Sequence, residues 1–152
     1  RDYKVTGVQT CALPISEKAV IPLFEAFSKG EFFMEEAIVQ ALHKIGEPAK
    51  EFLLNAVTTV PLTKENENAA IALIAFKEDP LIPATCLNLL ENPDVQKRDS
   101  LFAYLLLACD SLKEEKDIKR LQDLSSLDLS SAMKEELEWV LRSYKKSPFT
   151  KN

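Results

Sequence analysis

The fold is decided by residues 41–57, which read ALHKIGEPAKEFLLNAV. Apolar residues in this stretch recur at spacings of three and four, the pattern of helices that bury one face. Gly46 and Pro48 separate the two apolar runs. Glycine is favoured just after the end of a helix, and a helix tolerates proline in its first turn. The stretch therefore predicts the end of one amphipathic helix, a tight turn and the start of another.

The same spacing extends outward in both directions, and no run of strict alternation indicates a strand. Pro22 is expected in the first turn of the first helix, Gly30 at its end, and Ser130 or Ser131 at the N-cap of the last helix. We expect helices at about 17–28, 31–45, 66–76, 81–90 and 95–109. Another helix is expected from 48 to the loop at 60–63, a further one from the polar stretch 113–116 to 124, and the last from 130 or 131 to about 146. The chain is predicted to be all-α.

These helices form a repeat. Leu81-Ile82-Pro83 opens the fifth helix as Val20-Ile21-Pro22 opens the first, and four leucines take equivalent positions at intervals of roughly 31 to 35 residues: Leu42, Leu73, Leu106 and Leu141. Because a single helix pair cannot bury its apolar face alone, we expect a right-handed α-α superhelix, a solenoid of about four antiparallel helix pairs. The expected units are about 17–46, 48–78, 81–111 and 114–146, with a tail at 147–152.

Residues 1–15, RDYKVTGVQTCALPI, do not share this periodicity. From Val5 to Ile15 they resemble the translation of a short-read sequencing adapter, codon by codon; a native strand or loop is the alternative. We treat the segment as non-native, as a tag would be treated. It follows that the native N-terminus is expected to be missing, and that the array, open-ended at Ser16, is a fragment of a longer protein.

Composition excludes several classes. The chain has 152 residues, 46% of them hydrophobic, and only three glycines, too few for phosphate-binding loops. Without residues 1–15 there are 17 basic and 23 acidic residues, a formal net charge of −6, which disfavours nucleic acid as a partner. No apolar run approaches the roughly 20 residues of a membrane span. Cys86 and Cys109 lie within apolar helical patterns, so we expect free, buried thiols and a cytoplasmic protein.

Two stretches resemble the HEAT-like repeat family of the PBS-lyase type. Ala41-Leu42-His43-Lys44-Ile45-Gly46 matches the end of that family's second helix, and LLENPDVQKRDSLFAYLLLA matches its turn between helices, with Pro93-Asp94 in the turn and Arg98 where an arginine is typical. The resemblance covers most of 16–146, but the second and fourth units match by period alone. It implies a non-catalytic protein-binding scaffold whose second helices line the binding surface.

The residues that could carry chemistry are sparse. His43 is the only histidine, which excludes the two-iron HEAT-like hydroxylases, and no His or Cys cluster has zinc-ligand spacing. The acidic pairs Glu35-Glu36, Glu114-Glu115 and Glu135-Glu136 point about 100° apart on a helix, so their carboxylates are not expected to converge. Asp94 and Arg98 are expected to pair with each other or to bridge adjacent units. We therefore expect no catalytic residue, no cofactor and no metal.

Candidate partner contacts lie off the apolar stripes of the second helices: Gln40, His43, Lys44, Tyr104, Leu107, Trp139 and Arg142. Large apolar groups in such positions either pack on a neighbouring unit or anchor a partner, and both interpretations stay open for Trp139. The predicted function is a non-catalytic interaction scaffold for a protein or peptide. The alternative is a HEAT-like enzyme or enzyme accessory, either a bilin lyase-like subunit or an alkylpurine DNA glycosylase-like protein, and the glycosylase would need a basic groove.

Overall fold

The computed structural model describes the backbone of residues 7–29 and 32–145 and the side chains of 17–29 and 34–145. Within these ranges the chain is all-α, as predicted, and contains no strand. The α-helices are α1 (Gly7–Lys29), α2 (Phe32–Ile45), α3 (Glu47–Thr58), α4 (Lys64–Leu73), α5 (Leu81–Leu90), α6 (Asp99–Ala108), α7 (Glu115–Asp123) and α8 (Ser131–Lys145). Four short 3-10 helices join them: η1 (Ile74–Phe76), η2 (Val95–Lys97), η3 (Cys109–Ser111) and η4 (Leu124–Ser126).

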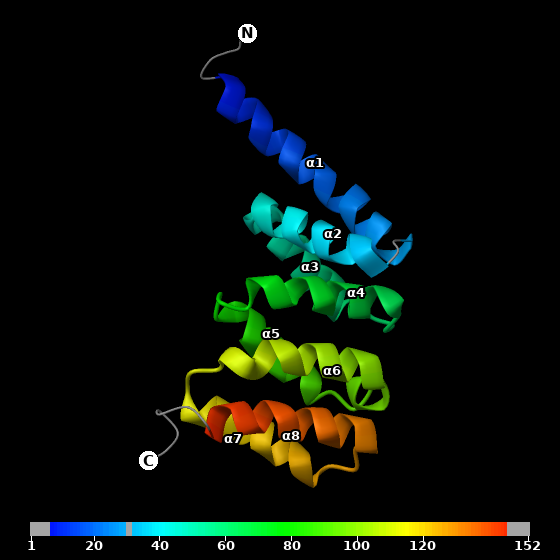
Figure 1. Ribbon diagram of the computed structural model, residues 1–152, viewed down its shortest axis with the longest axis vertical. Helices are drawn as coiled ribbons and strands as arrows, with labels where there is room; N and C mark the ends of the chain where they lie inside the picture. Colours follow the sequence, from blue (N-terminus) through cyan, green and yellow to red (C-terminus); the bar gives the residue numbers. More distant parts are fainter. Residues whose placement is uncertain (1–6, 30–31, 146–152) are drawn as a thin grey trace.

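The helices succeed one another along the long axis of the molecule in chain order (Figure 1). Consecutive helices pack as pairs, α1 with α2, α3 with α4 and α5 with α6. Between pairs, α4 packs on α6 and α6 on α8, while α3 packs on α5 and α5 on α7. The result is two layers of helices, in which the second helices α4, α6 and α8 lie against one another in order, whereas α2 packs on α3 and η1, and α1 packs on α3 and α4.

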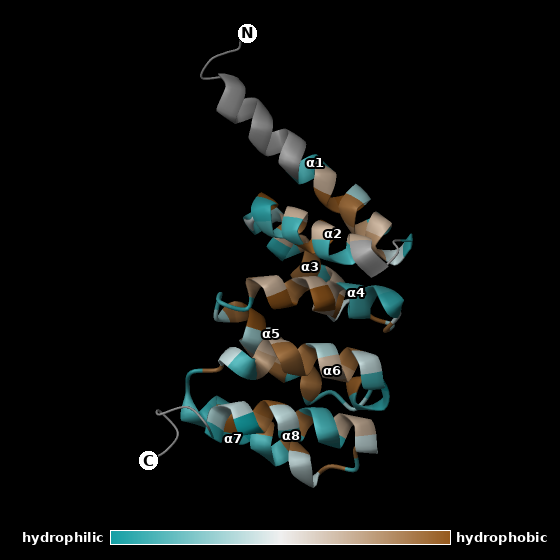
Figure 2. Ribbon diagram, in the orientation of Figure 1, coloured by the Kyte–Doolittle hydropathy of each residue, from teal (hydrophilic) through white to brown (hydrophobic). Residues whose placement is uncertain are grey.

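The core runs through this stack without interruption. Leu42, Leu73 and Leu106 have no exposed surface, which agrees with their predicted equivalence, whereas Leu141 is only partly buried. The apolar colouring of the ribbon is densest in α4, α5 and α6, and α7 and α8 are largely hydrophilic on the side seen in Figure 2. The middle units therefore contribute the most thoroughly buried part of the core.

Polar contacts between units also follow the repeat. The ion pairs Lys50–Asp79, Lys77–Asp110 and Arg120–Glu91 join residues separated by 29, 33 and 29 positions. The hydroxyl of Ser130 donates to Asp99 Oδ1, 31 positions away, at 2.8 Å. The contacts of Lys77, Arg120 and Ser130 each connect one unit to its neighbour, and Lys50 contacts the turn that leads into the next unit, as expected when a repeat touches only the units beside it.

The predicted start of the first helix is wrong. Helix α1 begins at Gly7 and not near Glu17. Pro22 consequently lies on the exposed surface inside α1 and not in a first turn. Gly30, Glu31, residues 1–6 and the predicted tail 147–152 lie outside the described residues, as do the side chains of 7–16.

The predicted helix at 95–109 is divided at Arg98, which has an extended backbone with φ −122° and ψ 98°. Arg98 Nη2 donates to the carbonyl oxygen of Leu62 at 2.9 Å, so the side chain bridges to the preceding unit. This contact confirms the bridging alternative for Arg98. The Asp94 backbone N–H donates to the side chain of Asn92, which closes the turn ahead of η2.

The fourth helix was predicted to begin at Asn66. In the structure α4 begins earlier, at Lys64, with Thr63 as its N-cap. Asn66 is buried and completes a capping box by accepting the Thr63 N–H at 2.7 Å. Its Nδ2 donates to the carbonyls of Ala56, Val57 and Thr59 at the end of α3. One side chain thus joins the end of α3 to the start of α4.

Candidate binding surface

When the four equivalent leucines are set in register, six of the seven predicted contact residues fall on two repeating positions. The position two residues before each leucine holds Gln40, Ile71, Tyr104 and Trp139 in turn. The position one residue after it holds His43, Ile74, Leu107 and Arg142. We call these eight residues the second-helix ladder. Lys44 is exposed but falls outside the register. Ile71 and Ile74 were missed because each is an ordinary isoleucine until the units are aligned.

None of the ladder residues is fully buried. Gln40, His43 and Arg142 are exposed, and Ile71, Ile74, Tyr104 and Leu107 are half-buried. Trp139 is 56% exposed, so it does not pack inside the stack. The ladder therefore marks the outer edge of the second-helix layer, beside the buried leucines, and carries apolar groups on its last three units.

At the end of the ladder the structure forms a hollow of about 510 Å³ between α6 and α8. Its lining residues are Leu107, Trp139, Arg142, Glu135, Glu136 and Glu138. Three predicted contact residues thus meet in one place. We call this feature the Trp139 hollow.

Glu135 and Glu136, whose carboxylates were not expected to converge, both line the Trp139 hollow together with Glu138. Adjacent helix positions do point about 100° apart, but an open hollow that spans the outer half of α8 is wide enough to include both. Three acidic residues therefore line the same hollow as the indole of Trp139.

The charges of the hollow are not neutralised within the described part of the chain. None of the ion pairs found there includes Glu135, Glu136 or Glu138. Arg142 also lines the hollow but forms no ion pair with the described carboxylates. Three carboxylates and one guanidinium leave a negative balance around an exposed aromatic ring.

The opposite end of the ladder is different. The His43 ring packs against Phe76 with centroids 5.1 Å apart, and both residues line a hollow of about 410 Å³ with Lys50 and Asp79. Lys50 forms ion pairs with Asp79 and Glu47. These hydrogen bonds raise the pKa of Lys50 and lower that of Asp79, so both groups keep their charges and neutralise each other. Glu47, Glu78 and Asp79 line this hollow with Lys50, so its balance of charge is also negative, but Lys50 pairs with two of the three carboxylates.

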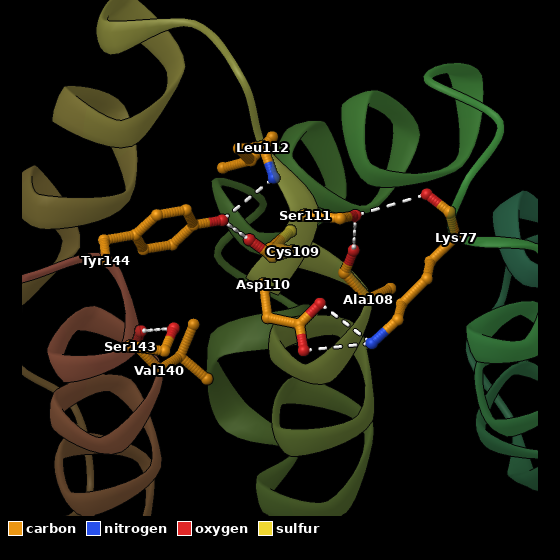
Figure 3. Close-up of polar contacts among 9 residues, drawn as sticks. All are labelled: Lys77, Ala108, Cys109, Asp110, Ser111, Leu112, Val140, Ser143 and Tyr144. Carbon is orange, nitrogen blue, oxygen red and sulfur yellow. Dashed lines mark hydrogen bonds and ion pairs between the residues drawn. The ribbon is translucent and has the colours of Figure 1, made fainter. Parts of the chain in front are cut away.

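A polar joint holds the last unit in place (Figure 3). The Tyr144 hydroxyl donates to the carbonyl oxygen of Cys109 and accepts the Leu112 N–H at 3.0 Å. In the same turn Asp110 pairs with Lys77 at 3.0 Å, and the Ser111 hydroxyl donates to the Lys77 carbonyl at 3.2 Å. Burial is the main cause of the raised pKa of Tyr144. The joint fixes α8, and with it Trp139, relative to the two units before it.

The two thiols are free and buried, as predicted. Burial raises the pKa of Cys86 to about 12 and that of Cys109 well above its ordinary value. A thiol in that state holds its proton at neutral pH and is a poor nucleophile. Among the described side chains, no group of three or more His, Cys, Asp or Glu residues could hold a metal ion.

Comparison with profiles of known protein families, with curated proteins and with solved structures finds no match to this chain. Within the described residues no helix is both long and apolar enough to cross a membrane. The interpretation of the site therefore depends on the geometry of the ladder and its hollow.

Proposed function

We propose that this chain is a non-catalytic scaffold that binds a protein or peptide, built from HEAT-like repeats as part of a longer protein, with the second-helix ladder as its binding surface. One observation carries the proposal: equivalent positions in successive units hold large, incompletely buried side chains, ending in Trp139 at 56% exposure. Core packing does not require a tryptophan that faces water, and tryptophan is the residue type most enriched among interface anchors.

The chemistry of the described side chains also favours binding over catalysis. Both thiols are protonated and buried, and the ring of the only histidine contacts Phe76 at a tilt of 50°, with no acid or nucleophile as a hydrogen-bonding partner in the described region. General acid-base catalysis needs a titratable group held within hydrogen-bond reach of a reacting atom. The described carboxylates instead lie on open surfaces or in ion pairs between units.

The alternative of a DNA glycosylase-like protein is opposed by the charge of the surface. Such an enzyme needs a basic groove to hold the phosphate backbone, and the hollow at the end of the ladder carries three glutamates. The alternative of a bilin lyase-like subunit has no observation in its favour among the described residues. We therefore propose no enzymatic activity.

The proposal can be tested by selecting binders from a displayed random-peptide library against the whole chain and then measuring their affinity for variants. Leu107→Asp and Trp139→Ala should each weaken the selected peptides by at least about tenfold, since loss of an interface anchor costs more than about 1.4 kcal/mol. Leu81→Ala is the matched control, because Leu81 on α5 is 53% exposed but lies off the ladder. Peptides that respond to Leu81→Ala and not to the ladder variants would refute the proposal.

A further inference from the structure

We propose that the Trp139 hollow binds a basic peptide segment, one that presents arginine or lysine side chains next to an apolar residue. This inference rests on the proposed function and names the chemistry of the partner at one end of the ladder. It is carried by the residues that line the hollow: an aromatic ring, an aliphatic side chain, and three carboxylates that outnumber the single guanidinium of Arg142.

The charge of the hollow selects the partner. Glu135, Glu136 and Glu138 form no ion pair within the described part of the chain, so each carboxylate remains available to a cation. Some other carboxylates at the boundaries between units are paired, as in Lys50–Asp79 and Arg120–Glu91. An acidic peptide would face repulsion from three glutamates, and complementary charge at an interface mainly sets specificity and the rate of encounter.

The exposed indole favours a cation for a second reason. A guanidinium or ammonium group over the face of a tryptophan is attracted by the negative potential of the ring. Three glutamates line the same hollow as this ring, so one arginine side chain can stack on Trp139 and hydrogen-bond to a glutamate at the same time. Leu107, across on α6, supplies an apolar contact for a neighbouring aliphatic side chain.

The shape of the hollow favours a peptide over a small molecule. Its volume of about 510 Å³ would suit a small ligand, but only six residues line it and it opens broadly to solvent. Small-ligand sites enclose most of the ligand surface, which this hollow does not. A few side chains of a longer segment can occupy it while the rest of that segment continues along Tyr104 and Ile74, the half-buried apolar members of the ladder.

The hollow is also held rigidly enough to serve as a site. Tyr144, on the same helix as Trp139, is fixed by hydrogen bonds to the Cys109 carbonyl and the Leu112 N–H (Figure 3). Ser130 caps the start of α8 by accepting the Met133 N–H, and its hydroxyl also donates to Asp99 of the preceding unit. A surface that needs little ordering on binding keeps more of its interaction energy as affinity.

The test uses the whole chain and a fluorescein-labelled ten-residue peptide that contains four arginines and two leucines, with binding measured by fluorescence anisotropy. A second peptide has glutamate in place of each arginine. Because Trp139 is the only tryptophan, a change in its emission reports occupancy of the hollow directly. We expect the basic peptide to bind and shift this emission, and the acidic peptide to do neither. Trp139→Ala should weaken the basic peptide by about tenfold.

A matched pair of variants separates a site from the general attraction of an acidic protein for a basic peptide. E135Q/E138Q and E51Q/E115Q change the net charge equally, but Glu51 and Glu115 are exposed residues outside the hollow. We expect the first variant to weaken binding by about fivefold at low salt and the second by less than about twofold. Equal effects, or an unchanged Trp139 emission, would overturn the inference. Unchanged thermal unfolding of all variants shows that each remains folded.

The outcome also distinguishes this inference from the proposed function. If library-selected peptides bind the ladder but are acidic or neutral, the scaffold proposal stands and the basic partner is wrong. If no peptide, selected or designed, responds to Trp139→Ala or Leu107→Asp, both are wrong.

Discussion

Helices α6 and α8 take the same place in successive units, but their surroundings differ. Helix α6 packs against α4 on one side and α8 on the other, whereas among the described helices of that layer α8 packs against α6 alone. In register, Leu101 of α6 corresponds to Glu136 of α8, and Ala108 corresponds to Ser143. Both α6 residues are buried, and neither α8 residue is.

The difference shows that a repeat position has no fixed burial of its own. Leu106 is fully buried between two helices, and the equivalent Leu141 is only partly buried. The same contrast applies to the ladder, where Tyr104 is half-buried and Trp139 is exposed. Helix α8 therefore leaves its ladder side chains less covered than α6 does.

The largest expected effect compares the two equivalent leucines directly. Leu106→Ala should reduce the free energy of unfolding by about 3–4 kcal/mol, because it leaves a cavity in a fully packed site. Leu141→Ala should cost about 1 kcal/mol, since water already reaches part of the side chain. Urea unfolding followed by circular dichroism measures both. Equal losses would show that α8 is as well packed as α6, contrary to the structure.

The second effect is the pH dependence of stability that the two buried thiols are expected to cause. Burial raises the pKa of Cys86 to about 12 and that of Cys109 well above its ordinary value of 9.0. Above pH 9 the unfolded chain loses these protons while the folded chain keeps them, so stability is fully present below pH 9 and falls as the pH rises. Each thiol should contribute a slope of about −1.4 kcal/mol per pH unit in the free energy of unfolding.

The double variant Cys86→Ala/Cys109→Ala removes this slope between pH 9 and pH 10, whatever it does to the absolute stability. Tyr144 is the residue of α8 equivalent to Cys109, and its pKa is also raised. Its ordinary value of 10.0 places its contribution to the pH dependence of stability at higher pH. Urea unfolding at several pH values measures the slope. A double variant with an unchanged slope would show that the thiols titrate in the folded chain.

Much of the fold could be predicted from local pattern. The helix from Leu81 to Leu90 has the predicted bounds, because a proline near its start and a turn at Asn92-Pro93 mark both ends in the sequence. The break at Arg98 could not be predicted, since it depends on a hydrogen bond to Leu62 in the preceding unit. Start and stop residues act within a few positions, whereas contacts between units act across about thirty.

The candidate site could be predicted only in part for the same reason. Trp139, Leu107 and Arg142 were identified because they lie off the apolar stripes, and the structure brings them to one hollow. Ile74 was not identified, because a half-buried isoleucine resembles a core residue until its unit is aligned with the others. The joint role of the glutamates was missed because helix geometry gives the angle between neighbours but not the width of the surface they share.

The third effect concerns the polar joint, which fixes α8 to the unit before it. Tyr144→Phe removes the hydroxyl that contacts Leu112 and Cys109, so a buried N–H and a buried carbonyl lose a partner. We expect a loss of about 1–2 kcal/mol in the free energy of unfolding. Ser143→Ala on the exposed side of α8 is the control and should change stability by less than about 0.5 kcal/mol. If the two variants behave alike, the joint does not hold the last unit.

The smallest expected effect on stability is at Trp139, and it is the most informative about function. Trp139→Ala should change the free energy of unfolding by about 0.5 kcal/mol or less, because an indole that is 56% exposed leaves little cavity behind. Tyr104→Ala at the equivalent position of α6 should cost about 1–2 kcal/mol, since that ring is half-buried against the core. Urea unfolding of both variants measures the difference, and a soluble quencher should reach the Trp139 indole of the unmodified chain. A loss of about 3–5 kcal/mol from Trp139→Ala would instead show a tryptophan packed into the stack. The aromatic group that defines the hollow would then be part of the core, and α8 would have no exposed anchor to offer a partner.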